Sequence, residues 1–224
     1  NPPGDAVFNY WLKNAPQSAP SIVILDAAGK TVRTLTGTRK AGLNRVWWNL
    51  NNEPTKTPKL RTKPMYNAEF TMDADGTRPA PGFGTFSVQV PPGRYTVRLT
   101  VDGKSFTQPL EVRRDPNSAA TLADIKASTE LLLGMQTTAN ATADMLHTME
   151  AVRSQVATMN AVSSTPADVK SAGDSLNAKF IDVEQTIVDL RLTGRGQDEV
   201  RWTVQLGGQL SYLAGGIGSS DFAP

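Results

Sequence analysis

The spacing of apolar residues changes near residue 116, and this change constrains the fold more than any other feature of the chain. Before it, short runs alternate between apolar and polar residues and are separated by proline and glycine. After it, apolar residues recur every three or four positions, and only Pro166 and Pro224 follow Pro116. Alternation is typical of strands, and the longer spacing is typical of amphipathic helices. The chain has 224 residues, enough for two segregated parts of an α+β protein, with strands in residues 1–116 and helices in 117–224.

Short strands separated by turns indicate an antiparallel sandwich in the first part. Three runs alternate with period two, namely residues 7–13, 21–35 and 41–50. In the first run Phe8, Tyr10 and Leu12 share one face. Such a series of strands is typical of a β-sandwich of the immunoglobulin or fibronectin kind.

Residues 91–117 predict a hairpin. The first strand carries an apolar face made of Tyr95, Val97, Leu99 and Val101, and the second returns with Phe106, Leu110 and Val112. Asp102 and Gly103 between them suit a two-residue turn that needs positive φ. Because Pro109 cannot donate a ladder hydrogen bond, we expect its strand at a sheet edge or next to a bulge.

Residues 52–91 interrupt the strand pattern with a segment rich in proline and glycine. A segment of about forty residues is too long for an ordinary hairpin loop, and such loops are usually functional or packed on a neighbour. Residues 86–90 are a further candidate strand within it.

The second part predicts a helical hairpin followed by a third helix. Thr121 and Asp124 resemble a capping box at the start of a helix that extends to Val162 and is about 60 Å long. Gly134 and Asn140 are its candidate kinks. A third helix is expected near Asp198, with one apolar side and two internal glycines: Leu206, Leu210, Leu213 and Ile217, and Gly207 and Gly208.

The second helix has a clear start signal, in which Thr165 caps, Pro166 takes the first helical position and Asp168 complements the helix terminus. Its apolar residues are spaced by threes and fours and should pack on the first helix: Val169, Leu176, Phe180, Val183, Ile187 and Leu190. The helix should end before Gly194.

Composition excludes several classes of function. The formal net charge of +2 produces no global field that would attract nucleic acid, and no apolar run is long enough to span a membrane. The chain has no cysteine and one histidine, His147, so thiolate catalysis, a catalytic triad and a multi-histidine metal site are all absent. The densest basic stretch, residues 55–64, contains Lys56, Lys59, Arg61 and Lys63 and is expected to be a solvated loop.

Two short motifs resemble ligand sites, but their surroundings do not fit. Lys30 follows a glycine as in a phosphate loop, yet the earlier glycine of that motif is replaced by Ile24, which indicates a turn. Residues 73–76 resemble part of a calcium loop but lack its later ligands, so they predict a plain turn. We therefore expect no catalytic, metal or cofactor residue in this chain.

The adjacent tryptophans Trp47 and Trp48 should face opposite sides of one strand. Trp48, together with Val46, is expected in the core, which leaves Trp47 pointing outward. An outward tryptophan is either a stacking platform for a sugar or a side chain covered by the residue 52–91 segment or the helices.

Several stretches together resemble the C-terminal region of large bacterial exported proteins that carry a sortilin-like or BNR-repeat β-propeller, often labelled glycosyl-hydrolase-like. The stretches are "VILDAAGKTVRTLTG", "AGLNRVWWNL", "PPGRYTVRLTVDGKSFTQPLEVRRDP", "DPNSAATLADIKASTELLLGM" and "LGGQLSYLAGGIGSSDFAP". The β-part is similar to the immunoglobulin-like domain of flagellar hook-capping proteins. Where Trp47 stands, the family often has a smaller apolar residue. The resemblance implies export from the cell, and it places any catalytic residues in the propeller.

Three functions are consistent with these observations. The first is a non-catalytic accessory module, excised from a longer precursor, that docks on the propeller of the same polypeptide or on another protein subunit. The second is a polysaccharide-binding module that uses Trp47 with Tyr66 or Phe83 from the residue 52–91 segment. The third is an autonomous hydrolase, for which the chain offers no identifiable pair of carboxylates in a cleft.

Overall fold

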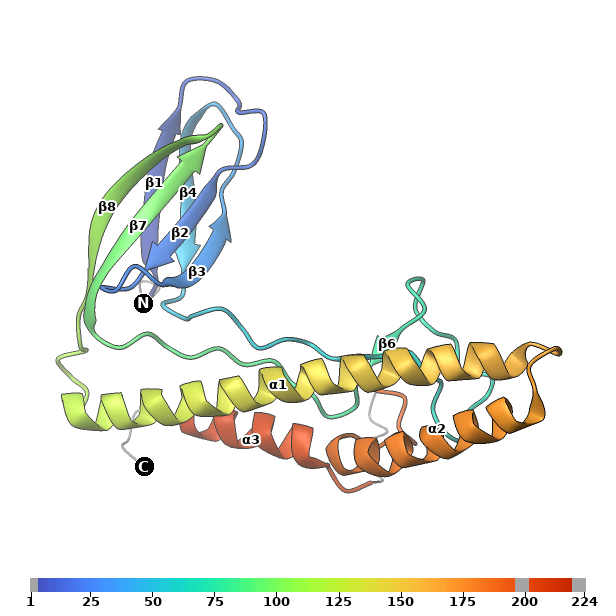
Figure 1. The fold of residues 1–224 in the computed structure, drawn as a ribbon. Helices are drawn as coiled ribbons and strands as arrows, with labels where there is room; N and C mark the ends of the chain where they lie inside the picture. The colour runs from blue at the N-terminus through green and yellow to red at the C-terminus, as the bar shows by residue number, and fades with distance from the viewer. Residues whose placement is uncertain (1–3, 196–201, 219–224) are drawn as a thin grey trace. The chain divides into compact units, whose positions relative to one another are not determined.

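The structure is a computed structural model that describes residues 4–195 and 202–218, and these form eight strands and three helices (Figure 1). Every strand pair is antiparallel, so the protein is α+β with antiparallel sheets. The residues divide into two compact units. We call residues 4–54, 87–133 and Gly218 the β unit, and residues 55–86, 134–195 and 202–217 the helical unit.

The β unit contains two sheets. One pairs β1 with β4, and the other has the strand order β3-β2-β7-β8. The strands are β1 (Ala6–Leu12), β2 (Ser21–Leu25), β3 (Thr31–Thr36), β4 (Gly42–Trp48), β7 (Gly93–Val101) and β8 (Lys104–Val112). The alternating runs of the sequence therefore do form strands, as predicted.

Both sheets contribute to a single apolar core. Trp48 of β4 is 1% exposed and packs in one cluster with Ile22, Ile24 and Tyr95 of the other sheet. Its ring stacks on Phe8 at 6.4 Å between centroids and meets Tyr95 edge-on at 6.3 Å. The inward orientation predicted for Trp48 is confirmed.

The β7–β8 hairpin turns at the predicted residues. Asp102 and Gly103 have φ values of 44° and 80°, the left-handed region that a two-residue turn requires. Pro109 lies on β8, an edge strand, which confirms the expectation from its missing N–H. Phe106 belongs to the inward set of β8 but remains exposed. It pairs with Leu99 near the turn, at the end of the strand farthest from Leu110 and Val112.

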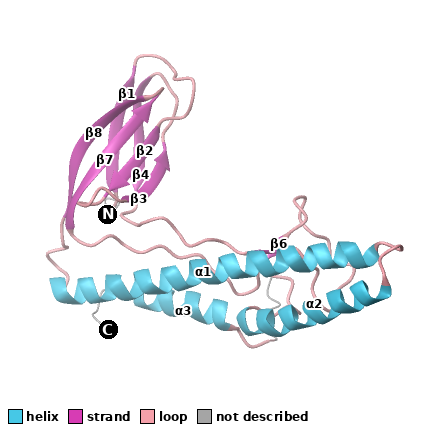
Figure 2. Cartoon of the chain, in the orientation of Figure 1, coloured by secondary structure: helices cyan, strands magenta, loops and turns pink. Residues whose placement is uncertain are grey.

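The three helices are α1 (Leu122–Ala161), α2 (Ala167–Ile187) and α3 (Leu206–Gly218) (Figure 2). The helical unit contains α1 from Gly134 onward, α2, α3 up to Ile217, and a short sheet of β5 (Lys59–Leu60) and β6 (Arg78–Pro79). The first helix, α1, is continuous over 40 residues, without a break at Gly134 or Asn140. Its predicted capping box is present, because Thr121 N–H donates to the Asp124 carboxylate and Asp124 N–H donates to the Thr121 hydroxyl.

The start and end of α2 differ from the prediction. Thr165 does not cap this helix, because its hydroxyl donates to the Met159 carbonyl at 2.7 Å, and Pro166 takes the N-cap position. The helix ends at Ile187, since Val188 is extended, and Leu190 is therefore buried in a turn instead of on a helical stripe. The third helix begins at Leu206, and the start predicted near Asp198 lies outside the described residues.

The segment Thr55–Phe86 belongs to the helical unit, although it interrupts the β unit in sequence. Leu60 and Ala80 from this segment join Leu146 and Met149 of α1 in one buried cluster. The segment is therefore packed on a neighbour, and the compact units do not follow the expected division at residue 116. Residues 86–90 do not form the candidate strand, and of these Gln89 makes an isolated bridge to Asn51.

Candidate functional site

A buried charged cluster joins α1 to α2 in the helical unit. It consists of Glu150 and Arg153 from α1 and Glu184 from α2, and all three side chains are buried. The Nη1 atom of Arg153 donates to Glu150 Oε1 at 2.7 Å and also to Glu184 Oε2. Its Nε donates to Asn177 Oδ1 at 2.9 Å. One guanidinium thus lies between two carboxylates.

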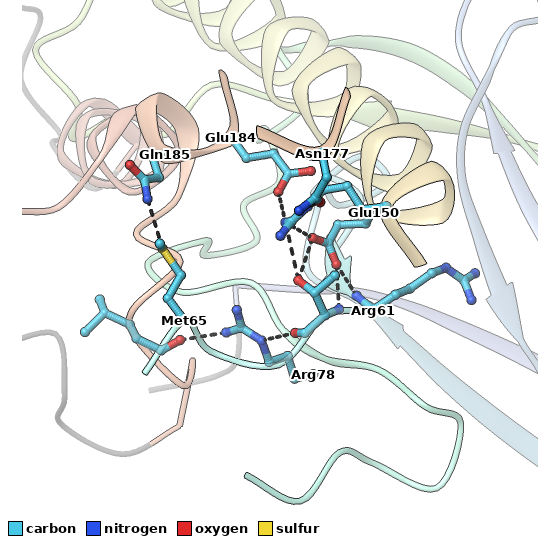
Figure 3. Close-up of polar contacts among 10 residues, drawn as sticks. Arg61, Met65, Arg78, Glu150, Asn177, Glu184 and Gln185 are labelled. Carbon is cyan, nitrogen blue, oxygen red and sulfur yellow. Dashed lines mark hydrogen bonds and ion pairs between the residues drawn. The ribbon is translucent and has the colours of Figure 1, made fainter. Parts of the chain in front are cut away.

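The cluster also fixes the backbone of the Thr55–Phe86 segment. Glu150 Oε2 accepts hydrogen bonds from the N–H groups of Arg61 and Thr62, and Glu150 Oε1 accepts one from the Thr62 hydroxyl at 2.8 Å (Figure 3). Arg78 lies on the other side of this backbone and donates to the Thr62 carbonyl at 2.7 Å and the Leu192 carbonyl at 2.6 Å. These charge-assisted bonds hold the segment against the helices.

The electrostatics of the cluster favour one bound proton. Burial, and then the negative charge of Glu150, raise the pKa of Glu184 to about 7, against the attraction of Arg153. Glu184 Oε1 is buried and has no hydrogen-bond partner among the described residues. A proton on this carboxyl group lowers the excess negative charge of the cluster.

The burial of this cluster argues against a role in catalysis. Glu150 and Glu184 are both 0% exposed, so neither carboxyl group reaches solvent. A small cavity in the same unit is lined instead by other residues, including Pro81, Gly82, Asp189 and Trp202. The cluster can hold a proton and bind backbone groups, but it presents no surface to a substrate.

The outer face of the β1–β4 ladder is the most aromatic exposed surface of the β unit. Three residue pairs form it, Val7 with Trp47, Asn9 with Arg45, and Trp11 with Leu43, and we call these six residues the tryptophan face. Trp11 is 65% exposed and Trp47 is 45% exposed. The outward orientation of Trp47, predicted from strand alternation, is therefore present.

Polar groups occupy the middle of the tryptophan face. Arg45 Nε donates to Asn9 Oδ1 at 2.9 Å, which joins the two strands at their central pair. The same guanidinium lies 5.9 Å from the centre of the Trp47 ring, within range of a cation–π interaction. Asn9 and Arg45 are both exposed.

Tyr66 and Phe83, the other two candidate ligand residues, both belong to the helical unit, whereas Trp47 belongs to the β unit. Tyr66 is 81% exposed. Phe83 packs on the apolar core of the helical unit and against Gly207 of α3, where a Cβ atom would lie 2.0 Å from its ring. Gly207 thus permits close approach of a loop to α3. Packing accounts for Phe83 without a ligand.

Sequence reasoning did not select Trp11, Asn9 or Arg45. The alternation of residues 7–13 already placed Phe8, Tyr10 and Leu12 inward, so Trp11 had to point outward. What the sequence did not provide was the pairing of β1 with β4, two strands separated by β2 and β3, which brings Trp11 and Trp47 to one face.

A second exposed apolar surface lies along α2. We call Val169, Leu176 and Val183 the α2 stripe, and they are 37%, 40% and 46% exposed. The prediction that these residues pack within the hairpin is wrong. Gly173, Glu184 and Ile187 are the buried positions of α2, because the charged cluster and the close contact of Gly173 with Val156 and Asn160 set the rotation of the helix.

The motif-like residues are all engaged within the chain. Lys30 closes a turn in which its N–H donates to Asp26 Oδ1, and Gly29 has a φ of 78°. Asp73 pairs with Arg195 and Asp75 pairs with Lys59, which donates to it at 2.6 Å.

The basic stretch of residues 55–64 also makes contacts within the chain. Lys56 pairs with Asp144 at 2.5 Å, so that stretch is not a free loop. His147 accepts a hydrogen bond from Lys59 N–H at 3.2 Å.

Within residues 4–195 and 202–218 no group of three or more His, Cys, Asp or Glu side chains is placed to hold a metal ion. None of the helices in this part of the chain is both long and apolar enough to cross a membrane.

Comparisons with known proteins identify no relative of this chain. No model of a known protein family matches the chain, and neither a curated protein nor a solved structure matches it. Function must therefore be argued from the surfaces described above.

Proposed function

We propose that this chain is a non-catalytic accessory module, the C-terminal part of a larger exported β-propeller protein, which docks on the propeller or on another protein subunit. The resemblance in sequence supports this context. We also assign the β unit to the immunoglobulin or fibronectin class, since its two antiparallel sheets share one core. The observation that carries the docking role is the exposed α2 stripe.

The spacing of the α2 stripe supports helix packing against a partner. Its three residues recur every seven positions, and Ala172 lies on the same side, so one position of a heptad pattern is apolar in each repeat. The helix already buries the side next to this stripe, with Gly173 and Glu184. An apolar line of this kind, left exposed on a folded unit, is a candidate protein interface.

A pair of substitutions on α2 tests the docking role. Leu176→Asp places a charge in the α2 stripe, whereas Ala178→Asp places the same charge on the opposite, exposed side of the helix. We expect Leu176→Asp to weaken binding of this chain to the separately expressed propeller by at least about tenfold, and Ala178→Asp to leave it unchanged. Size-exclusion chromatography of the mixtures and isothermal titration calorimetry measure both. Equal binding by the two variants would remove the α2 stripe from the interface.

Carbohydrate binding is a second candidate function, favoured by the two exposed tryptophans of one β face. Trp11 and Trp47 lie on adjacent strands and are exposed, as stacking platforms for sugar rings must be. Electrophoresis through polysaccharide-containing gels tests this function. We expect retardation that Trp47→Ala abolishes, and a chain that no polysaccharide retards would exclude the function.

A further inference from the structure

The order of residues on the tryptophan face distinguishes between possible ligands. In protein interfaces, the aromatic residues that dominate binding cluster near the centre and polar residues surround them. The tryptophan face has the reverse order, with Asn9 and Arg45 in the middle row and a tryptophan in each outer row. A linear polysaccharide fits this order, because its sugar rings offer apolar faces for stacking and polar groups between them.

The length of the face suits an extended ligand. Trp11 and the residue paired with Trp47, Val7, are four positions apart on β1. At about 3.4 Å per residue the two tryptophan rows are therefore separated by about 14 Å along the strands. Several sugar rings are needed to bridge that distance, so both tryptophans can stack on the same chain.

The charged residues on and beside the tryptophan face indicate which class of polysaccharide it binds. Neither β1 nor β4 contains Asp or Glu, and among the described residues no carboxylate pairs with Arg45. Exposed Lys13 and Lys40 add positive charge beyond the Trp11 row, and exposed Asp5 adds one negative charge beyond the Trp47 row at the other end. Arg45 Nε donates to Asn9, and the two Nη atoms at the end of a guanidinium can bind one carboxylate with two parallel hydrogen bonds.

We infer that the tryptophan face binds a linear polysaccharide that carries carboxylate groups. Trp11 and Trp47 stack on its sugar rings, and Arg45, held in place by Asn9, pairs with a carboxylate between them. This inference rests on the second proposed function, carbohydrate binding, and names its ligand class and the residues that select it.

The test compares two polymers that share a backbone. Polygalacturonate carries a carboxylate on each sugar, and highly methyl-esterified pectin has the same backbone with most of that charge removed. We expect the chain to bind polygalacturonate, and Trp11→Ala, Trp47→Ala and Arg45→Gln each to weaken this binding by about tenfold or more. Phe106→Ala and Arg94→Gln, exposed residues of the other sheet, are matched controls and should bind like the unchanged chain.

Each outcome of this test distinguishes between possible ligands of the tryptophan face. Weaker binding to the esterified polymer than to polygalacturonate supports the inference, provided that Trp11→Ala, Trp47→Ala and Arg45→Gln weaken binding and the two control variants do not. Equal binding of the two polymers and a neutral effect of Arg45→Gln would overturn the carboxylate assignment while carbohydrate binding stands. Equal binding to polyglutamate would overturn the sugar assignment, since charge alone would then explain the affinity. Binding to neither polysaccharide, with binding to the propeller lost in Trp11→Ala, would overturn the inference in favour of protein docking.

Discussion

At the residue scale, Glu184 makes the stability of the helical unit depend on pH. Its pKa is about 7 in the folded chain and 4.5 as the ordinary value. Because the folded pKa is the higher one, the stabilisation is fully present below pH 4.5 and is lost as the pH rises through 7. We expect the free energy of unfolding to fall by about 2 kcal/mol between pH 5 and pH 8. Urea unfolding followed by circular dichroism at 222 nm measures this.

Glu184→Gln keeps the neutral form at every pH, so this variant should lose most of that slope. Glu130→Gln on α1, whose side chain is 66% exposed, is the matched control and should keep the slope. A wild-type chain with a flat profile from pH 5 to pH 8 would contradict the assignment of the proton to this cluster.

Glu150 is the residue on which the Thr55–Phe86 segment depends most. Glu150→Ala leaves two backbone N–H groups, of Arg61 and Thr62, without their acceptor and leaves Arg153 with one carboxylate. We expect a loss of about 3–5 kcal/mol in the free energy of unfolding. Glu130→Ala, which removes an exposed ion pair with Lys126, should cost less than about 1 kcal/mol. Limited proteolysis should cut the Glu150→Ala variant first within residues 55–86.

At the element scale, local signals in the sequence were sufficient for some features and not for others. The capping box at Thr121 and the turn at Asp102 and Gly103 depend on residues within a few positions of each other, and both are present. Thr165 carries an equally good local signal but bonds to the end of α1. Its hydroxyl had a competing acceptor that only the folded hairpin supplies.

The rotation of α2 could not be predicted from its apolar spacing. The hydrophobic pattern favoured burial of Leu176, yet Glu184 faces the core, where its Oε2 accepts a hydrogen bond from Arg153. Likewise, the attachment of Thr55–Phe86 uses backbone N–H groups and a carboxylate about ninety residues away in sequence. Neither arrangement leaves a periodic signal in one sequence.

Two glycines of α3, Gly207 and Gly216, allow a matched comparison of Gly→Ala substitutions within one helix. A Cβ atom on Gly207 would lie 2.0 Å from the Phe83 ring, whereas a Cβ on Gly216 meets no atom within 4 Å. Gly207→Ala should therefore destabilise the helical unit by about 1–3 kcal/mol because it displaces Phe83 from the core. Gly216→Ala should stabilise the helix by up to about 1 kcal/mol. Thermal unfolding of both variants compares them, and equal effects would show that the Phe83 contact does not form.

At the scale of the whole molecule, the two units are interleaved along the chain. The helical unit takes Thr55–Phe86 from between the strands of the β unit, so a cut at residue 116 removes part of its core. We expect residues 117–224 expressed alone to unfold at a clearly lower urea concentration than the same helices in the full chain. Addition of a peptide that covers residues 55–86 should restore part of the difference. An unchanged midpoint would show that the helices do not need the segment.

The central claim is that the chain docks on the propeller or a partner subunit through α2. Hydrogen exchange of residues 167–187 tests it directly, because it can be measured in this chain alone and in the full-length propeller protein. We predict that exchange around Leu176 and Val183 slows by at least about tenfold in the full-length protein, while the exchange of β7 and β8 stays the same. Identical exchange of α2 in the two proteins would contradict the docking role.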